Sequence, residues 1–326
     1  MNHAEDDNFD GDIFIYRGGR APQHISHARI DKSVDEIEDW AFDGCRNLVQ
    51  VDTHDGIRKI GAYSFNRCTS LRQINLKSVV EFDWYAFGYC FDLESVEFGD
   101  RLETIGFSAF SGCSSLKHLK LPSIISIGGC AFYDCESLTD IELSDRLQRI
   151  GSGAFWTRFR SCDLTHIAVP LKRNLFEFND TFERYNQFDG CDQLTTVDLV
   201  GGTHRTVAAL HMESWRTKMI AEINRINQVL PNTYAARKGG AIRQWMNSVM
   251  DKLDHYKAEH SRYVKEGITL LELALWKAKL GESEEYYGEG KTKKAKINAE
   301  SARKDKRMTC GAEIVIKNVL PYLQLE

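Results

Sequence analysis

The most regular feature of the chain is a pattern of apolar positions that recurs from residue 34 to residue 143. It reads Ile-x3-Ala/Ser-Phe-x2-Cys-x2-Leu-x2-Φ-x-Φ, where Φ is apolar, and successive copies are 22 or 23 residues apart. A unit of this length cannot bury a core alone, so the units must stack into a solenoid, with about seven repeats over residues 31–200 and the last two degenerate. The repeated phenylalanines and cysteines are Phe42, Phe65, Phe87, Phe110, Phe132 and Cys45, Cys68, Cys90, Cys113, Cys135.

The last part of each copy alternates apolar and polar residues. Ile74 and Leu76 alternate with Gln73 and Asn75, which is the period of a strand with one buried and one exposed face. Stacked copies predict one parallel sheet of such strands and a continuous inner stack of phenylalanines. A second short apolar segment precedes each Ala-Phe turn, at Val34, Ile57, Val79, Leu102, Ile124 and Leu147.

The N-terminal residues 1–30 lack the pattern and are predicted to be a tail and a cap. Residues 1–12 are acidic and polar, which is typical of a flexible tail. Short apolar runs at Ile13–Tyr16 and Ile25–Ile30 predict two strands that cover the open edge of the first repeat.

The last two copies are irregular. The sixth begins at Ile150 but reaches its cysteine only at Cys162. Residues 171–187 then interrupt the pattern before residues 188–199 resume it. This insertion is either a packed cap or a protrusion for recognition, and the sequence leaves both open.

Helical periodicity replaces the repeat after residues 200–204, which we interpret as a hinge. Apolar residues recur every three or four positions from Met212 to Leu230 and again from Ile242 to Tyr263, and a third apolar segment follows Gly267. This pattern predicts a small helical bundle over residues 205–280. Residues 281–307 are predicted to be a charged, flexible linker, and the apolar residues 308–326 a segment that docks on the bundle.

The repeat register Ile-Gly-x2-Ala-Phe-x2-Cys-x2-Leu-x2-Ile-x-Leu resembles the BspA-type branch of the leucine-rich-repeat family over residues 30–200. The resemblance implies a leucine-rich-repeat solenoid of short parallel β-strands with turns or short helices, here followed by an α-helical C-terminal domain. It also implies protein recognition, including surface adhesion in some members, and no catalytic residues. The region from His211 onward is similar to the C-terminal part of algal (diatom) proteins of this type.

Charge is distributed unevenly along the chain. Residues 1–205 carry 21 Lys and Arg against 32 Asp and Glu, whereas residues 206–326 carry 21 against 15. The acidic N-terminus does not read as a secretory signal, and no apolar stretch is long enough to span a membrane. Five of the nine cysteines fall at one core-facing repeat position, which favours buried free thiols in a reducing compartment. We therefore expect a cytoplasmic protein, with a nuclear location as an alternative.

No motif of enzyme or cofactor chemistry is present. His255 and His260 are five residues apart, which places them on different faces of a helix, and the cysteines form no Cys-x2-Cys pair. A phosphate loop, a dinucleotide fingerprint and a nucleophile elbow are all missing from the sequence. We predict no enzyme activity, no cofactor and no metal site.

The outward residues of the predicted strands form a polar, acidic surface that is the candidate protein-binding site. These side chains either solvate the sheet, with Lys120 between Glu97 and Glu142 in a charge ladder, or bind a basic partner. The candidate residues are Gln73, Asn75, Ser95, Glu97, His118, Lys120, Asp140, Glu142 and His166.

We interpret the protein as a non-enzymatic protein-interaction module with an unidentified partner, and self-association through the C-terminal helices is an option. One alternative is a surface or secreted adhesion protein. A second is a nucleic-acid-associated protein acting through the basic residues 291–307, although no aromatic residues are interleaved there for base stacking.

Overall fold

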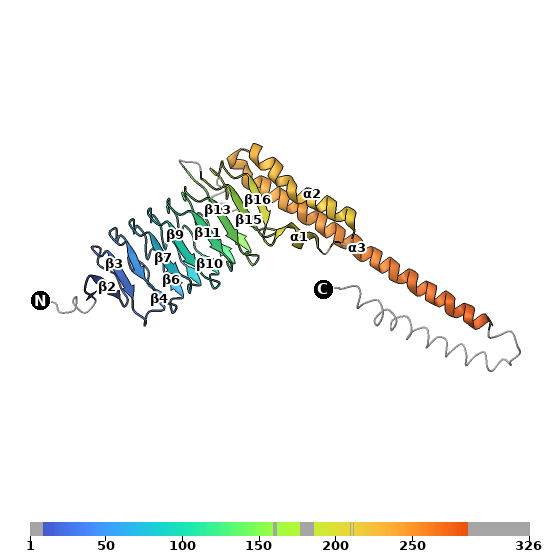
Figure 1. Ribbon diagram of the computed structural model, residues 1–326, viewed down its shortest axis with the longest axis horizontal. Coiled ribbons are helices and arrows are strands. Elements are labelled where there is room, and N and C mark those ends of the chain that lie inside the picture. Colours follow the sequence, from blue (N-terminus) through green and yellow to red (C-terminus); the bar gives the residue numbers. More distant parts are fainter. Residues whose placement is uncertain (1–8, 159–161, 177–185, 209, 211, 286–326) are drawn as a thin grey trace. The chain divides into compact units, whose positions relative to one another are not determined.

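The computed structural model describes residues 9–158, 162–176, 186–208, 210 and 212–285. Successive coils of the chain each contribute one long strand and, in the regular part, one short strand (Figure 1). The fold is the expected parallel β-solenoid followed by helices, because each copy buries its apolar residues against the copies on either side.

The long strands lie in parallel, in chain order, along one side of the solenoid. They form two sheets, β1-β2-β3-β5-β7-β9 and β11-β13-β15-β16, in which only β1 is antiparallel to its neighbour. The single sheet expected from the sequence is therefore divided between β9 and β11. The coils of β9 and β11 still bond through their turns, where the backbone N–H of Phe87 donates to the carbonyl oxygen of Ala109 at 2.6 Å, so the order of the coils continues across this division. The bounds are β1 Phe9–Asp10, β2 Ile13–Tyr16, β3 His27–Ile30, β5 Gln50–Asp52, β7 Gln73–Leu76, β9 Ser95–Phe98, β11 His118–Leu121, β13 Asp140–Leu143, β15 His166–Val169 and β16 Thr196–Leu199.

A second parallel sheet, which the sequence did not predict, forms between the short apolar segments and the Ala-Phe turns. Its order is β14-β12-β10-β8-β6-β4, so each short strand pairs with those of the adjacent coils. The bounds are β4 Glu36–Ile37, β6 Lys59–Ile60, β8 Glu81–Phe82, β10 Thr104–Ile105, β12 Ser126–Ile127 and β14 Arg149–Ile150.

The phenylalanines form the predicted inner stack. Phe87 lies between Phe65 and Phe110, with ring centroids 4.9 and 5.1 Å away and ring planes within 8° of parallel. The stack continues through Phe155 to Phe188, whose centroids are 5.6 Å apart, so it includes both irregular coils. Offset-parallel rings at such distances contribute packing energy beyond the burial of their area.

The repeated cysteines are buried thiols that bond to the backbone of the preceding coil. Cys68 Sγ donates to the carbonyl oxygen of Phe42 at 3.1 Å, and Cys90 Sγ donates to that of Phe65 at 3.1 Å. All eight cysteines among the described residues are free and buried, and Cys310 lies outside them. Burial raises the pKa of the Cys90 thiol well above its usual range, so this thiol stays protonated and donates.

The helices are α1 (Gly202–Val207), α2 (Glu213–Val229), the 3-10 turn η3 (Leu230–Asn232) and α3 (Ala235–Glu285). The second and third apolar segments lie on one helix, because α3 continues through Gly267. One glycine costs a helix only about 1 kcal/mol relative to alanine, and the flanking Lys and Glu residues favour helix. The expected linker begins inside α3, and residues 286–326 lie outside the described part of the chain.

The chain divides into two compact units between Leu253 and Asp254. The solenoid unit therefore includes α1, α2 and the start of α3, beyond the boundary expected near residue 205. The reason is local: Lys238 Nζ donates to the carbonyl oxygens of Asp192 and Leu194, at 2.6 Å each, in the last coil. Asn227 Oδ1 also accepts from the backbone N–H of Val197 in β16 at 2.8 Å.

The insertion at residues 171–187 contributes to the core at its start. Leu175 and Phe176 are buried, and Phe176 forms a parallel bridge with Ile150. Its ring meets that of Phe188 edge-on, with centroids 5.9 Å apart. These contacts pack the start of the insertion against the core. Residues 177–185 lie outside the described range, and the choice between a cap and a protrusion stays a prediction.

Candidate functional site

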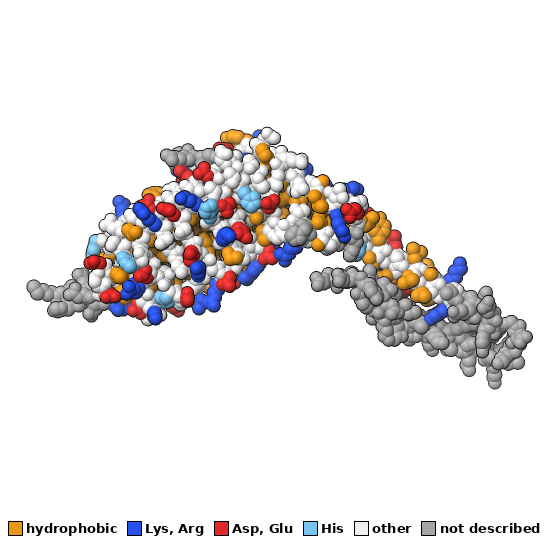
Figure 2. Space-filling view, viewed as in Figure 1, with side chains coloured by type: hydrophobic (Ala, Val, Ile, Leu, Met, Phe, Trp, Pro, Cys, Tyr) orange, Lys and Arg blue, Asp and Glu red, His pale blue; other side chains and the backbone are white. Residues whose placement is uncertain are grey.

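The outward side chains of the long strands from β5 to β16 form the surface that we name the strand face. Strand alternation and register place equivalent residues in columns, so His118, Asp140 and His166 lie side by side on β11, β13 and β15. Figure 2 shows acidic, basic and histidine side chains intermixed over the solenoid on the side that it draws. All nine residues predicted from the sequence lie on strands of this face, and each is exposed or partly exposed.

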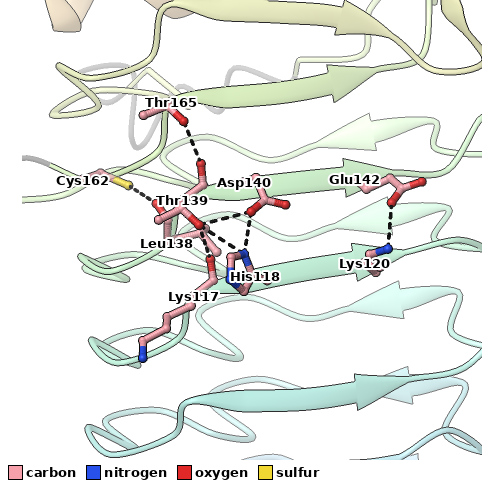
Figure 3. Close-up of polar contacts among 9 residues, drawn as sticks. All are labelled: Lys117, His118, Lys120, Leu138, Thr139, Asp140, Glu142, Cys162 and Thr165. Carbon is pink, nitrogen blue, oxygen red and sulfur yellow. Dashed lines mark hydrogen bonds and ion pairs between the residues drawn. The ribbon is translucent and has the colours of Figure 1, made fainter.

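Histidine and aspartate side chains pair across adjacent strands of the strand face. His118 Nδ1 lies 2.5 Å from Asp140 Oδ2, and the hydroxyl of Thr139 donates to the same carboxylate at 3.1 Å (Figure 3). His166 Nε2 lies 3.0 Å from Asp198 Oδ2 on β16. These contacts hold the two histidines over neighbouring strands, which fixes the positions of their rings.

The longer charged side chains pair along the same face but do not form the expected ladder. Lys120 Nζ lies 3.6 Å from Glu142, as Figure 3 shows, whereas Glu97 pairs with Lys77 at 2.8 Å. The ladder is split because Glu97 belongs to β9 and Lys120 to β11, which are in different sheets. Both pairs are more than half exposed, so each contributes little to stability.

A pocket of about 480 Å³ lies at the C-terminal end of the strand face. Its walls come from β13, β15, β16 and the start of α1, where Gly202 and Thr203 close one side. Three carboxylates line it, those of Asp140, Glu142 and Asp198, with side chains 46, 67 and 61 % exposed. Carboxylates that stay accessible in a concave site can accept hydrogen bonds from an incoming cationic side chain.

The sequence missed part of this pocket. Asp198 follows the same alternation as Asp140, and its place in the seventh copy was the available signal. Gly202 and Thr203 had no such signal, because they were assigned to a hinge and the start of α1 closes the pocket only in the fold. Ala168, at the pocket floor between two acidic positions, leaves the space that a longer side chain would fill.

Within the described ranges, no group of three or more His, Cys, Asp or Glu side chains is arranged to hold a metal ion. The repeated thiols are buried with raised pKa values, which makes them poor nucleophiles. Among the described helices, none combines the length and apolar character that crossing a membrane requires.

Stacked short coils with one strand face define a β-solenoid of the leucine-rich-repeat class. The family model described as "BspA type Leucine rich repeat region" matches in six copies, at residues 21–117 and 80–201. These matches cover more than half of the 326 residues, and the chain belongs to the BspA-type leucine-rich-repeat family. No curated protein matches the chain.

Solved structures of bacterial leucine-rich-repeat proteins are similar to this chain. A leucine-rich-repeat protein of T. pallidum is 28% identical, with 62% of this chain and 88% of that chain covered and a TM-score of 0.46. A leucine-rich cell surface protein of Faecalibacterium prausnitzii is 24% identical, with 57% and 50% covered and a TM-score of 0.44. A leucine-rich-repeat protein of Bacteroides ovatus is 23% identical, with 54% and 61% covered and a TM-score of 0.34.

Proposed function

We propose that the protein is a non-enzymatic recognition module whose strand face binds a basic segment of a partner protein. The observation that carries the proposal is the pocket on this face, where three accessible carboxylates surround a space large enough for a lysine or arginine side chain. Repeat solenoids use such extended surfaces for recognition. Family membership supports the general function, and the acidic charge of residues 1–205 supports the basic partner.

Reversal of charge on the strand face tests the proposal. The probe is a fluorescein-labelled oligolysine peptide, and its binding is followed by fluorescence anisotropy at several salt concentrations. The double variant Glu97→Lys with Glu142→Lys should weaken binding about tenfold or more and flatten the salt dependence, because two carboxylates on the binding surface become cations.

A matched control changes the net charge equally elsewhere. Asp55 and Asp92 are exposed and lie in turns outside the strand face, so Asp55→Lys with Asp92→Lys should alter the affinity less than threefold. Equal weakening in both double variants would show attraction to overall charge alone, and the strand face would then not be the binding site.

We also propose that the protein works in a reducing compartment, with surface adhesion as the alternative that the family allows. The eight free, buried thiols support this location. Protein isolated from its native source and denatured without reductant should react through all nine cysteines of the sequence. Fewer reactive thiols would indicate disulfides and favour the extracellular alternative. The basic segment 291–307 lies outside the described residues, and a role in nucleic-acid binding remains a prediction.

A further inference from the structure

A second surface of the solenoid, away from the long strands, carries large exposed aromatic side chains. We name it the aromatic side and define it as the outward residues of the segments 36–41, 59–64, 81–86 and 104–109. Trp40 is 42% exposed and Trp84 is 60% exposed. The ring of Tyr63 stacks between those of Trp40 and Tyr85, with centroids 4.1 and 5.0 Å away. Exposed aromatic groups of this kind mark interaction surfaces more often than single exposed apolar residues do.

The backbone of these turns shows that the fold does not require the aromatic residues. Trp40, Tyr63 and Tyr85 share one repeat position and have φ values of 63, 57 and 54°. This left-handed region is unfavourable for bulky side chains. The same position in later coils holds Ser108, Cys130 and Gly153, with the same sign of φ. Because small residues make the same turn, three strained aromatics in succession point to a role outside folding.

Two of the four segments are rich in acidic residues. The four segments contain five carboxylates, Glu36, Glu38, Asp39, Glu81 and Asp83, and one basic residue, Lys59. The equivalent segments of the next two coils, 126–131 and 149–154, contain neither an aromatic nor an acidic residue. Among the six equivalent segments, acidic side chains therefore occur only in 36–41 and 81–86, the two that also carry a tryptophan. Their combination is complementary to a cation with an apolar or planar body.

One arginine of the chain already occupies the edge of this surface. The guanidinium of Arg20 lies 5.9 Å from the centre of the Trp40 ring, and its Nη2 donates to Asp43 Oδ2 at 3.3 Å. Its Nε donates to the carbonyl oxygen of Trp40 at 3.4 Å. This contact shows in one place how a planar cation can use the ring and the backbone carbonyl of Trp40 together with the carboxylate of Asp43 next to the aromatic side.

Trp84 also combines an aromatic ring with a neighbouring carboxylate, and its ring is exposed to solvent. Its ring is the most exposed of the aromatic side, and the preceding Asp83 is fixed beside it, since Asp83 Oδ1 accepts from the backbone N–H of Trp84 at 2.8 Å. Asp83 Oδ2 lies 3.6 Å from Lys59 Nζ, which Glu36 shares at the same distance. The single positive charge of Lys59 is thus shared between the carboxylates of Asp83 and Glu36. A second cation that binds here would meet a net negative charge.

We propose that the aromatic side binds an arginine-bearing segment of a partner protein, with a guanidinium stacked on Trp84 and paired with Asp83. This surface is separate from the strand face, so the proposal goes beyond the proposed function and does not depend on it. Arginine is favoured over lysine because its planar group stacks on a ring while its N–H groups still donate to a carboxylate.

The test compares two fluorescein-labelled peptides, one of alternating glycine and arginine and one of alternating glycine and lysine, by fluorescence anisotropy. Wild-type protein should bind the arginine peptide more tightly than the lysine peptide. Trp84→Ala should weaken arginine-peptide binding about three- to tenfold and remove this preference. Asp83→Asn should weaken it by a similar factor.

Phe91→Ala is the matched control, because Phe91 is also an exposed aromatic residue, 47% exposed, in the same repeat but outside the four segments. It should leave both affinities within twofold. The double variant Glu97→Lys with Glu142→Lys should keep the arginine preference, which separates this proposal from the strand-face proposal. Circular dichroism and thermal unfolding confirm that each variant is folded, as expected for exposed positions.

Two results would overturn the proposal. One is arginine-peptide binding that is unchanged by Trp84→Ala in a folded protein. The other is protection of Trp84 from oxidation by a neutral oligosaccharide such as cellohexaose but not by the arginine peptide, which would assign the surface to carbohydrate.

Discussion

The regular coils and the closing end of the solenoid complete the same core by different means. In the regular coils, each coil bonds to its neighbour through the same repeat positions. For example, Cys90 Sγ donates to the carbonyl oxygen of Phe65 in the coil before it. The last coil has no successor, and unrepeated side chains take that place. Lys238, only 1% exposed, donates to two carbonyl oxygens there, and Asn227 accepts a strand N–H. Periodic residues therefore build the interior, while singular residues are needed where the period ends.

Burial of the Lys238 ammonium group costs free energy at the closing end of the solenoid. Burial lowers the pKa of Lys238, and the nearby Asp192 and Cys191 oppose that shift. A buried ammonium is tolerated only when it is well hydrogen-bonded, and two carbonyl oxygens at 2.6 Å meet that condition. Repeat proteins need such a cap because an open apolar coil end would associate with other chains.

The largest effect is expected inside the regular coils. Phe87→Ala should lower the free energy of unfolding by about 3–5 kcal/mol, because the ring is fully buried between two others and its removal leaves a cavity. Urea denaturation measures the change. Phe91→Ala, at an exposed ring of the same repeat, should stay within about 0.5 kcal/mol.

Phe188→Ala sharpens the comparison at the other end of the stack. An equal loss at Phe87 and Phe188 would show that the cap completes the core as well as another coil does. A loss at Phe188 smaller by more than about 2 kcal/mol would mean that the last coil contributes little to the cooperative unit.

The next largest effect is expected at the closing end. Lys238→Met keeps the apolar stem but removes the donor to Asp192 and Leu194, and should cost about 2–3 kcal/mol. Hydrogen exchange should rise in β16 more than in β7, because Lys238 donates to carbonyl oxygens of the last coil. Lys218→Met, at an exposed lysine of α2, is the control. Uniform exchange across both strands would contradict a local capping role.

The smallest expected effect on stability comes from the carboxylate of Glu222, in the helices of the cap, and it depends on pH. Burial would raise the pKa of Glu222, but hydrogen bonds from Lys252, Ser248 and Arg225 outweigh it and lower the pKa from 4.5 to about 2. The stabilisation is then present above pH 4.5 and is lost as the pH falls towards 2. Glu222→Gln should cost about 1–2 kcal/mol at neutral pH.

The pH profile is the measurement that decides this case. The melting temperature of the wild type should fall towards that of Glu222→Gln between pH 4.5 and 2. A difference that stays constant over this range would show that the ion pairs of Glu222 do not set the acid stability of the cap.

The repeat made much of the fold predictable. The positions of Phe65, Cys68 and Ile74 recur, and recurrence at a fixed period allows one solution, in which equivalent residues stack. The phenylalanine stack and the buried thiols follow from it. The outward columns of the strand face follow as well, because strand alternation assigns each residue to one face.

The errors occurred where a residue has no equivalent in the other repeats. The apolar segments before and after Gly267 were assigned to parts of a bundle, although one glycine costs little in a long helix and α3 continues through it. Lys238 carries no sequence signal of burial, since an isolated lysine beside two glycines is typical of a surface. The aromatic side was also missed, but for another reason: Trp40, Tyr63 and Tyr85 share one repeat position, so the period predicts that they stack, and only the structure shows that this position faces outward.

The sequence by itself determined the solenoid, its family, its core and the composition of its strand face, because each of these repeats along the chain and local periodicity defines it. The tertiary structure alone decided how Lys238 and Asn227 close the last coil and how Gly202 and Thr203 close the pocket of the strand face. Those features depend on contacts between residues without a common period, and such contacts exist only after the coils have stacked.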